Sequence, residues 1–213
     1  MLKQIITGCA CLFLFAFTRK TAETYSTISP LHAYSAEWDQ PKYHKCNTAS
    51  KEKYLTKEEK DVCWILNMAR VNPALFAKTV VKQFPELGGQ GWLVNIDEYK
   101  SLLDTMQKIK PLRQLYPDSL CWESARCHAE TSGNLSYTGH ERMTDECRQK
   151  RRFFGECCDY GYKEPLYIIM HLLIDQGVPS LGHRYLILSG FSGLGVSIQP
   201  HKRYGYNAVL DFY

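Results

Sequence analysis

The chain has 213 residues, and 45% of them are apolar, which is enough to bury the core of one domain of ordinary size. Its formal net charge is +4, and three of the positive charges (Lys3, Arg19 and Lys20) lie in a segment that we expect to be removed. The charge that remains is too small to favour nucleic acid as a partner.

Residues 1–22 have the pattern of an export signal. Lys3 precedes an apolar run over residues 5–17, which suits a signal sequence and is shorter than the ~20 residues that a membrane-spanning helix needs. A lipoprotein-type sequence around Cys9 is the less favoured alternative, because Cys9 precedes the end of the apolar run. No later stretch is long and apolar enough to span a membrane. We therefore expect a secreted protein, periplasmic or extracellular, without a transmembrane segment in its mature form.

Residues 23–53 are rich in Ser, Thr, Tyr and Pro and show no period, which indicates a linker or a peripheral arm before a domain at residues 54–213. Thr56 and Glu59 form a capping box at the start of a helix. Apolar residues at helical spacing give this helix a buried face, and Asn72-Pro73 ends it.

Three more helices are expected before the sequence becomes irregular. Residues 74–84 form a short helix that Pro85 stops, residues 96–108 form the next, and residues 120–132 form a third that is followed by Gly133. Residues 139–155 have no clear period, and their basic cluster is a solvated face: Arg148, Lys150, Arg151 and Arg152.

The last third of the chain combines one apolar helix with two strands. Leu166, Ile169, Met170 and Leu173 recur at helical spacing, and Gly177 and Pro179 follow the helix. Residues 194–198 and 208–212 read as strands that pair antiparallel, joined by a polar loop at residues 199–207. Helices dominate and strands come last, so the predicted fold class is α+β.

Seven cysteines lie outside the signal: Cys46, Cys63, Cys121, Cys127, Cys147, Cys157 and Cys158. Exported chains can keep disulfides, and an odd number leaves at least one thiol free or paired outside the chain. Cys157 and Cys158 are adjacent, and a bond between neighbours is strained, so each pairs elsewhere or stays reduced. The sequence assigns no pairing.

Common catalytic motifs are absent: there is no Walker loop, no G-x-S-x-G elbow, no H-E-x-x-H and no C-x-x-C pair. What remains is a set of histidines and acids that we place in loops: His140, Glu156, Asp175 and His183. Asp175 ends a helix, where the helix dipole disfavours an acid, so it either caps the following turn or faces His183 across a pocket. The four residues could bind Zn²⁺ or another divalent ion, pair as base and orienting acid, or form a buried polar network.

Three other histidines are expected to lie outside this set. His128 and His171 lie on predicted helices, and we interpret both as structural. His201 lies in the polar loop between the two strands, where we expect it to be exposed.

The order of several short motifs resembles the CAP superfamily, the SCP-like group of cysteine-rich secretory, antigen 5 and pathogenesis-related 1 proteins. Residues 65–73 are similar to the opening "LNxxRxxP" helix of that family, and His128-Ala129, Gly139-His140 and Gly155-Glu156 follow in its order. Residues 182–188 resemble the bacterial "GHRxNIL", and residues 193–196 resemble "xxGVG". The resemblance covers about residues 54–213.

The resemblance implies an α-β-α sandwich with a small antiparallel sheet and a cleft that holds a tetrad of two histidines and two acids. His140, Glu156 and His183 match three members of the tetrad, and Asp175 is the best candidate for the fourth. His140 and His183 would be the ligands of a divalent metal such as zinc or magnesium. The chain departs from the family at three positions: Cys157 and Leu186 each replace an asparagine, and Asp175 replaces a glutamate.

These observations favour a secreted binding module whose ligand is a lipid, a metal, another small molecule or a protein. One alternative is a peptidase-like hydrolase that uses metal-bound water or a His–Glu pair. Cys157 is a conceivable nucleophile with His140 or His183 as its base, although disulfide pairing is the expected fate of an exported cysteine. A further alternative is a structural exported domain in which the tetrad is a polar lock.

Overall fold

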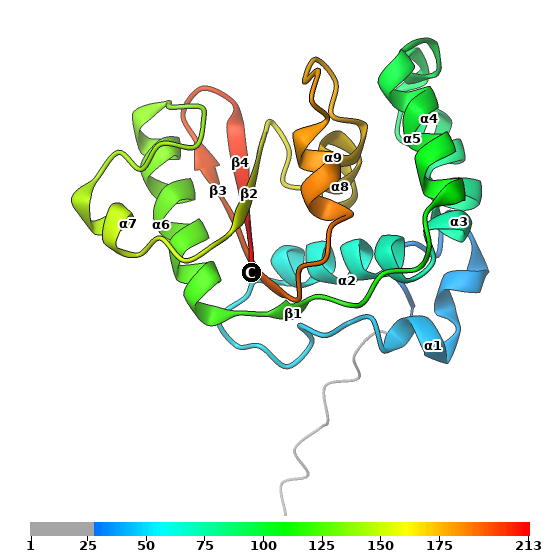
Figure 1. Cartoon of the computed structure of the whole chain (residues 1–213), viewed down its shortest axis with the longest axis horizontal. Coiled ribbons are helices and arrows are strands. Elements are labelled where there is room, and N and C mark those ends of the chain that lie inside the picture. Colours follow the sequence, from blue (N-terminus) through cyan, green and yellow to red (C-terminus); the bar gives the residue numbers. More distant parts are fainter. Residues whose placement is uncertain (1–27) are drawn as a thin grey trace, which may run out of the picture.

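The structure is a computed structural model that describes residues 28–213 (Figure 1). The predicted export signal at residues 1–22 lies outside the described residues. Within residues 28–213, no helix is both long and apolar enough to cross a membrane.

Helices make up most of the regular structure. The α-helices are α1 (Pro41–His44), α2 (Lys57–Val71), α3 (Pro73–Phe76), α4 (Lys82–Leu87), α5 (Asp97–Lys108), α6 (Ser119–Leu135), α7 (Asp145–Gln149), α8 (Pro165–Ile174) and α9 (Gly182–Ile187). Two 3-10 helices, η1 (Ala36–Asp39) and η3 (Gly91–Asn95), and a π-helical turn, η2 (Ala77–Val81), complete them.

Four strands form one sheet in the order β1-β3-β4-β2. The strands β3 (Gly193–His201) and β4 (Gly205–Phe212) pair antiparallel, as the sequence predicts. Both strands are longer than predicted, so the loop between them is shorter than residues 199–207. The strand β2 (Gly155–Tyr160) pairs antiparallel with β4 and forms one edge. The short β1 (Tyr116–Pro117) runs parallel to β3 and makes the sheet mixed.

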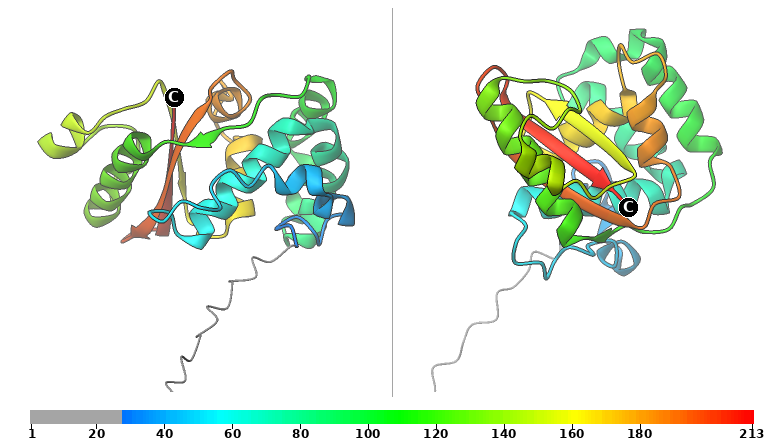
Figure 2. Two further views of the ribbon diagram at one scale, coloured as in Figure 1. Left: turned by 90° about the horizontal axis from the view of Figure 1, so that it is seen from below. Right: turned by 60° about the vertical axis from the view of Figure 1, so that its left-hand side comes forward.

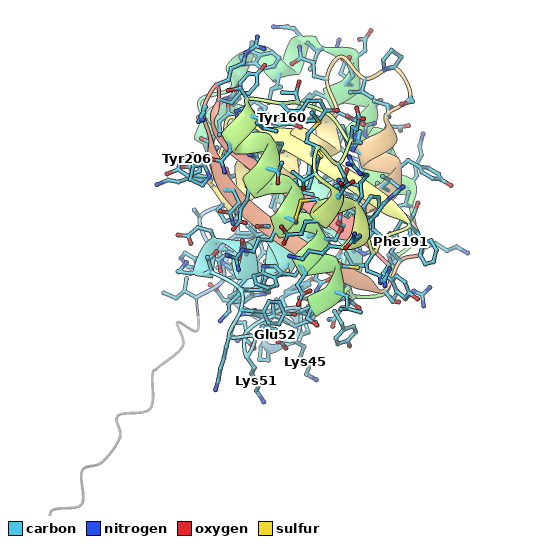
Figure 3. All side chains as sticks on the ribbon, turned by 90° about the vertical axis from the view of Figure 1, so that its left-hand side faces the viewer. Lys45, Lys51, Glu52, Tyr160, Phe191 and Tyr206 are labelled. Atoms are coloured by element: carbon cyan, nitrogen blue, oxygen red, sulfur yellow. A yellow bond between two sulfur atoms is a disulfide. The ribbon has the colours of Figure 1, made fainter. Side chains whose placement is uncertain are left out.

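Helices cover both faces of the sheet, so the predicted α+β class and sandwich architecture are confirmed. The helix α6 packs on β3 and β4 from one face, whereas α2, α8 and α9 contact the strands from the other (Figure 2). Seen from the side of α6, this helix lies in front of the sheet (Figure 3).

Two glycines allow α6 to lie close to β3. A Cβ atom at Gly133 would lie 2.1 Å from the carbonyl oxygen of Pro200, and one at Gly195 would lie 2.1 Å from the backbone of Cys121. Gly133 therefore belongs inside α6, and the prediction that the helix ends before it was wrong. Packing against the strand outweighs the low helix propensity of glycine at this position.

The single helix predicted at residues 74–84 is interrupted in the structure and does not stop at Pro85. It divides into α3, η2 and α4, and α4 runs through Pro85 to Leu87. The preceding π-helical turn relaxes the ordinary hydrogen-bond pattern before the proline, and Phe84 and Pro85 are buried there.

The described part of the predicted arm packs onto the domain. Trp38 is fully buried and its indole N–H donates to the Thr79 hydroxyl at 3.1 Å. The backbone carbonyl of Tyr43 accepts the indole N–H of Trp64 at 2.9 Å. Asn67 of α2 is also fully buried and donates to the carbonyls of Cys46 and Leu115, so α2 holds this arm and the segment before β1 together.

One disulfide, between Cys127 and Cys147, joins α6 to α7, as proteins of oxidising compartments can carry. The other cysteines of the described residues are free and buried: Cys46, Cys63, Cys121, Cys157 and Cys158. The expectation of a disulfide at Cys157 was therefore wrong, because its thiol is enclosed in the main hydrophobic core.

Candidate functional site

The four residues singled out from the sequence lie together at the open edge of the sheet. His140 follows α6, Glu156 lies on the edge strand β2, Asp175 ends α8 and His183 lies in the first turn of α9. The expectation that Glu156 and His183 lie in loops was wrong. The strand β2 is buried along most of its length, so it lacks the polar and apolar alternation by which strands are recognised.

Each histidine is paired with one acid. The Nδ1 atom of His140 lies 2.8 Å from Oε1 of Glu156, and Nδ1 of His183 lies 2.7 Å from Oδ1 of Asp175. The acid side chains are 3% and 1% exposed, whereas those of His140 and His183 are 57% and 21% exposed. Each carboxylate thus orients a ring whose Nε2 atom is left for other partners.

The sequence left two roles open for Asp175, capping the turn after α8 or facing His183, and in the structure Asp175 has both. Its backbone is left-handed, with φ 58°, at the C-cap of α8. Its Oδ2 atom accepts the backbone N–H of His183 at 2.9 Å while Oδ1 faces the His183 ring. The same acid therefore fixes the start of α9 and the orientation of the histidine.

The two acid–histidine pairs face each other. The ring centroids of His140 and His183 are 6.2 Å apart, and their planes are inclined by 40°. The two rings reach this position from opposite faces of the sheet, one after α6 and the other at α9. This arrangement is the geometry expected of a cleft with two basic groups.

Arg142 stabilises the negative charge of Glu156 on β2. Burial opposes the ionisation of Glu156, but hydrogen bonds from His140 and Arg142 outweigh it and lower the pKa of Glu156 to about 2. Asp211 of β4 lies opposite Glu156 and 3.4 Å from Arg142. Burial and the neighbouring Glu156 charge raise the pKa of Asp211 well above its usual range.

A pocket of about 250 Å³ opens beside His183 and Asp175. Its wall mixes polar and apolar side chains, and Trp92, Leu172 and Val178 contribute much of the apolar part. A pocket with a few placed polar groups in an apolar wall is typical of a small-molecule site.

Sequence reasoning missed a second acid–histidine pair in this pocket. Nδ1 of His171 lies 3.3 Å from Oδ1 of Asp159, and the His171 ring meets the Tyr162 ring edge-on at 4.4 Å. Burial raises the pKa of Asp159. The sequence does place two acids, Glu156 and Asp159, close together in one short segment. This spacing points to the pair only when the segment is known to be the strand β2.

The described residues contain a compact group of side chains that could hold a metal ion, and it differs from the predicted ligands His140 and His183. Ligand atoms of His128, Glu156 and Cys158 lie within 4.8 Å of one another, and all three residues are buried. Among residues 28–213 this is the group of three such donors found at that spacing, and it includes neither His140 nor His183. The chain thus has a group that could hold a metal, while ligation by His140 and His183 stays a prediction.

His201 is buried, at 2% exposure, and the prediction of an exposed His201 was wrong. The strand β3 extends to His201, and Nε2 of the ring donates to the carbonyl of Tyr137 at 3.0 Å while Nδ1 accepts the backbone N–H of Arg203 at 3.1 Å. By contrast, Arg148, Arg151 and Arg152 of the predicted basic face are exposed.

Comparison of the chain with protein-family models, with curated proteins and with solved structures gave no match.

Proposed function

We propose that this chain is an exported binding module of the CAP type, and that its ligand occupies the cleft between His140 and His183 and the adjoining pocket. The observation that carries the proposal is the pair of acid–histidine units facing each other with ring centroids 6.2 Å apart. The family assignment rests on the order of the sequence motifs and is supported by the way their residues meet at one edge of the sheet.

The pocket supports a small ligand or the headgroup of a larger one. Its volume of about 250 Å³ is below the ~300–1,000 Å³ typical of sites for drug-sized molecules. The apolar wall suits a hydrocarbon portion, and the imidazoles of His171 and His183 suit hydroxyl, amine or phosphate groups. A lipid headgroup with the first part of its chain has this combination.

Binding is favoured over hydrolysis because the two thiols near the histidines, Cys157 and Cys158, are both buried, and burial raises the pKa of each well above its usual range. Cys157 is fully buried, its thiol lies 3.8 Å from the carbonyl of His183, and burial raises its pKa well above its usual range. A thiol in this state is a poor nucleophile, since the thiolate is the reactive form. Hydrolysis would therefore need a water molecule activated by His140 or His183.

The test is a titration of the full chain, followed by the imidazole ¹H–¹⁵N NMR signals, with three probes: Zn²⁺, a medium-chain fatty acid and a lysophospholipid. The proposal predicts that at least one probe saturably shifts the signals of His140 and His183. The control is His32, which also pairs with an aspartate, Asp39, but is exposed and belongs to the N-terminal arm. Equal small shifts at all three histidines would contradict the proposal and favour the polar lock.

A further inference from the structure

A second polar cluster lies between α6 and the edge of the sheet, on the side away from the main core. Glu156 and Cys158 are two residues apart on β2, so their side chains point to the same face of the sheet. Cys158 packs with Ala125 and Ala129 of α6, which places this face under the helix that carries His128. Tyr160, two residues further along β2, packs against the small hydrophobic cluster that contains Cys158, Ala125 and Ala129, and it is labelled in Figure 3.

The three side chains offer one nitrogen, one sulfur and one oxygen ligand. Their ligand atoms lie within 4.8 Å of one another. Zinc binds imidazole nitrogen, thiolate sulfur and carboxylate oxygen at ~2.0–2.3 Å, so a small adjustment of the side chains would bring all three onto one ion. Mg²⁺ and Ca²⁺ are disfavoured because both prefer oxygen ligands.

Within residues 28–213, the single hydrogen bond of the His128 ring leaves its other nitrogen without a partner. Nε2 lies 2.9 Å from the carbonyl oxygen of Gly139, so Nε2–H donates and the electron pair is on Nδ1. Nδ1 is buried and has no hydrogen-bond partner among the described residues. Histidines that bind metals commonly donate their other N–H to a backbone carbonyl in this way. A bound cation would give the unpartnered Nδ1 the interaction that it lacks.

Acidic side chains around the group also suit a cation. Two buried carboxylates, Glu156 and Asp211, share the single guanidinium of Arg142. Each oxygen of Glu156 accepts one of the hydrogen bonds from His140 and Arg142 and keeps a second electron pair. A divalent ion would add positive charge beside these two acids, and Cys158 would lose its proton on binding.

Access to the group lies beneath the half-exposed ring of His140. Its Nδ1 atom is 2.8 Å from Glu156 and 3.7 Å from Sγ of Cys158, so the ring lies over both. We expect entry of an ion to require rotation of this side chain. Three protein ligands would leave a fourth position of a tetrahedral ion for water or for a ligand from the cleft.

We propose that His128, Glu156 and Cys158 form a zinc site under α6, which adjoins His140 through Glu156 and the neighbouring pocket through Cys158. The proposal does not depend on the cleft binding a lipid or any other ligand.

The test is titration of the full chain with Co²⁺, a spectroscopic substitute for zinc, because a cobalt–thiolate bond gives a charge-transfer absorption in the near ultraviolet. The site predicts this band at one cobalt per chain. It should be lost in Cys158→Ser and in His128→Gln, and it should persist in His183→Ala.

Cys157→Ser is the matched control. Cys157 is the adjacent residue and equally buried, but it points to the opposite face of β2, into the main core. This variant should keep the band. A folded wild-type chain without the band, or a band that survives Cys158→Ser, would overturn the proposal.

X-ray absorption of the zinc-loaded wild-type chain provides a readout that needs no variant. The site predicts one sulfur at ~2.3 Å together with nitrogen and oxygen ligands at ~2.0–2.2 Å. A zinc shell without sulfur, or one with two or more sulfurs, would contradict the assignment even if the Cys158 variant fails to fold.

Discussion

Oδ1 of Asp175 lies 2.7 Å from the ring of His183, and Oδ2 of the same carboxylate accepts the backbone N–H of His183 at 2.9 Å. An acid at the C-terminal end of α8 is unfavourable for the helix dipole. The contacts to α9 offset this cost, since hydrogen bonds to a charged group contribute about 1.5–3 kcal/mol each. Asp175 therefore connects α8 and α9 at the pocket that it lines with His183.

Replacing Asp175 with alanine should lower the free energy of unfolding by about 3–5 kcal/mol, because it removes both hydrogen bonds and puts alanine in a left-handed backbone conformation. Asp175→Asn should cost less, since asparagine tolerates that conformation and keeps one acceptor oxygen. Urea unfolding gives both values. Asp97, whose side chain is 97% exposed, is the control, and a loss at Asp175→Ala no larger than at Asp97→Ala would contradict this account.

Arg142 should be the most costly arginine to remove on the β2 side. Its guanidinium contacts Glu156 and Asp211, and all three side chains are almost fully buried. Removing one partner of a buried ionic group leaves uncompensated charge, so Arg142→Met should destabilise the protein by about 3–5 kcal/mol. The exposed Arg148 offers a matched control that should change stability by no more than about 0.5 kcal/mol. Equal effects in chemical denaturation would rule out this role.

Gly133→Ala tests the close packing of α6 on β3. The added Cβ would lie 2.1 Å from the carbonyl of Pro200, so helix and strand would have to separate, at a cost of about 1–3 kcal/mol. Gly91→Ala is the control, because nothing lies within 4 Å of the added atom. Thermal unfolding should show a lower Tm for Gly133→Ala alone. If the two variants unfold alike, α6 and β3 are less tightly packed than described.

Stability should fall as the solution becomes strongly alkaline, in part because of Cys63. Burial raises the pKa of this thiol to about 12 from the ordinary 9.0. Below pH 9 the thiol is protonated in both the folded and unfolded chains, so it contributes no pH dependence. Between pH 9 and 12 only the unfolded chain loses the proton, which favours unfolding by up to about 1.4 kcal/mol per pH unit.

Cys63→Ala should therefore show a smaller decrease in unfolding free energy than the wild-type chain between pH 9 and pH 10.5. Urea unfolding at three pH values in this range measures both slopes. The exposed Ser192→Ala variant serves as a control without a thiol. Identical slopes in the wild-type and Cys63→Ala chains would contradict the burial of Cys63.

The elements with a clear local signal were predictable from the sequence. The capping box of α2 is present, with Thr56 and Glu59 exchanging hydrogen bonds at 3.2 and 2.8 Å. The apolar period of α8 and the β3–β4 pair also follow local rules. These features depend on neighbours in the chain, so a single sequence contains the information.

The features that depend on contacts across the chain were not predictable in this way. The strand β2 is buried on both faces and lacks alternation, Gly133 is helical because of β3, and His201 is buried because β3 extends to it. The meeting of His140 with Glu156 was expected from the family resemblance, whereas that of Asp175 with His183 was one of two interpretations of the helix end, which the resemblance then favoured. The pairs Asp159–His171 and His128–Cys158 had no local signal, because each joins a helix to β2.

The most direct test of the proposed binding function is native mass spectrometry of the full chain, with a variant that fills the pocket. Val178 lies in the pocket wall on a loop, so Val178→Trp should block the pocket without disturbing the core. The exposed Val94, outside that wall, gives the matched variant Val94→Trp. We expect a bound small molecule on the wild-type and Val94→Trp chains and its loss from Val178→Trp. If all three chains show only the mass of the protein without a ligand, or if all three carry the same adduct, a ligand in this pocket is contradicted.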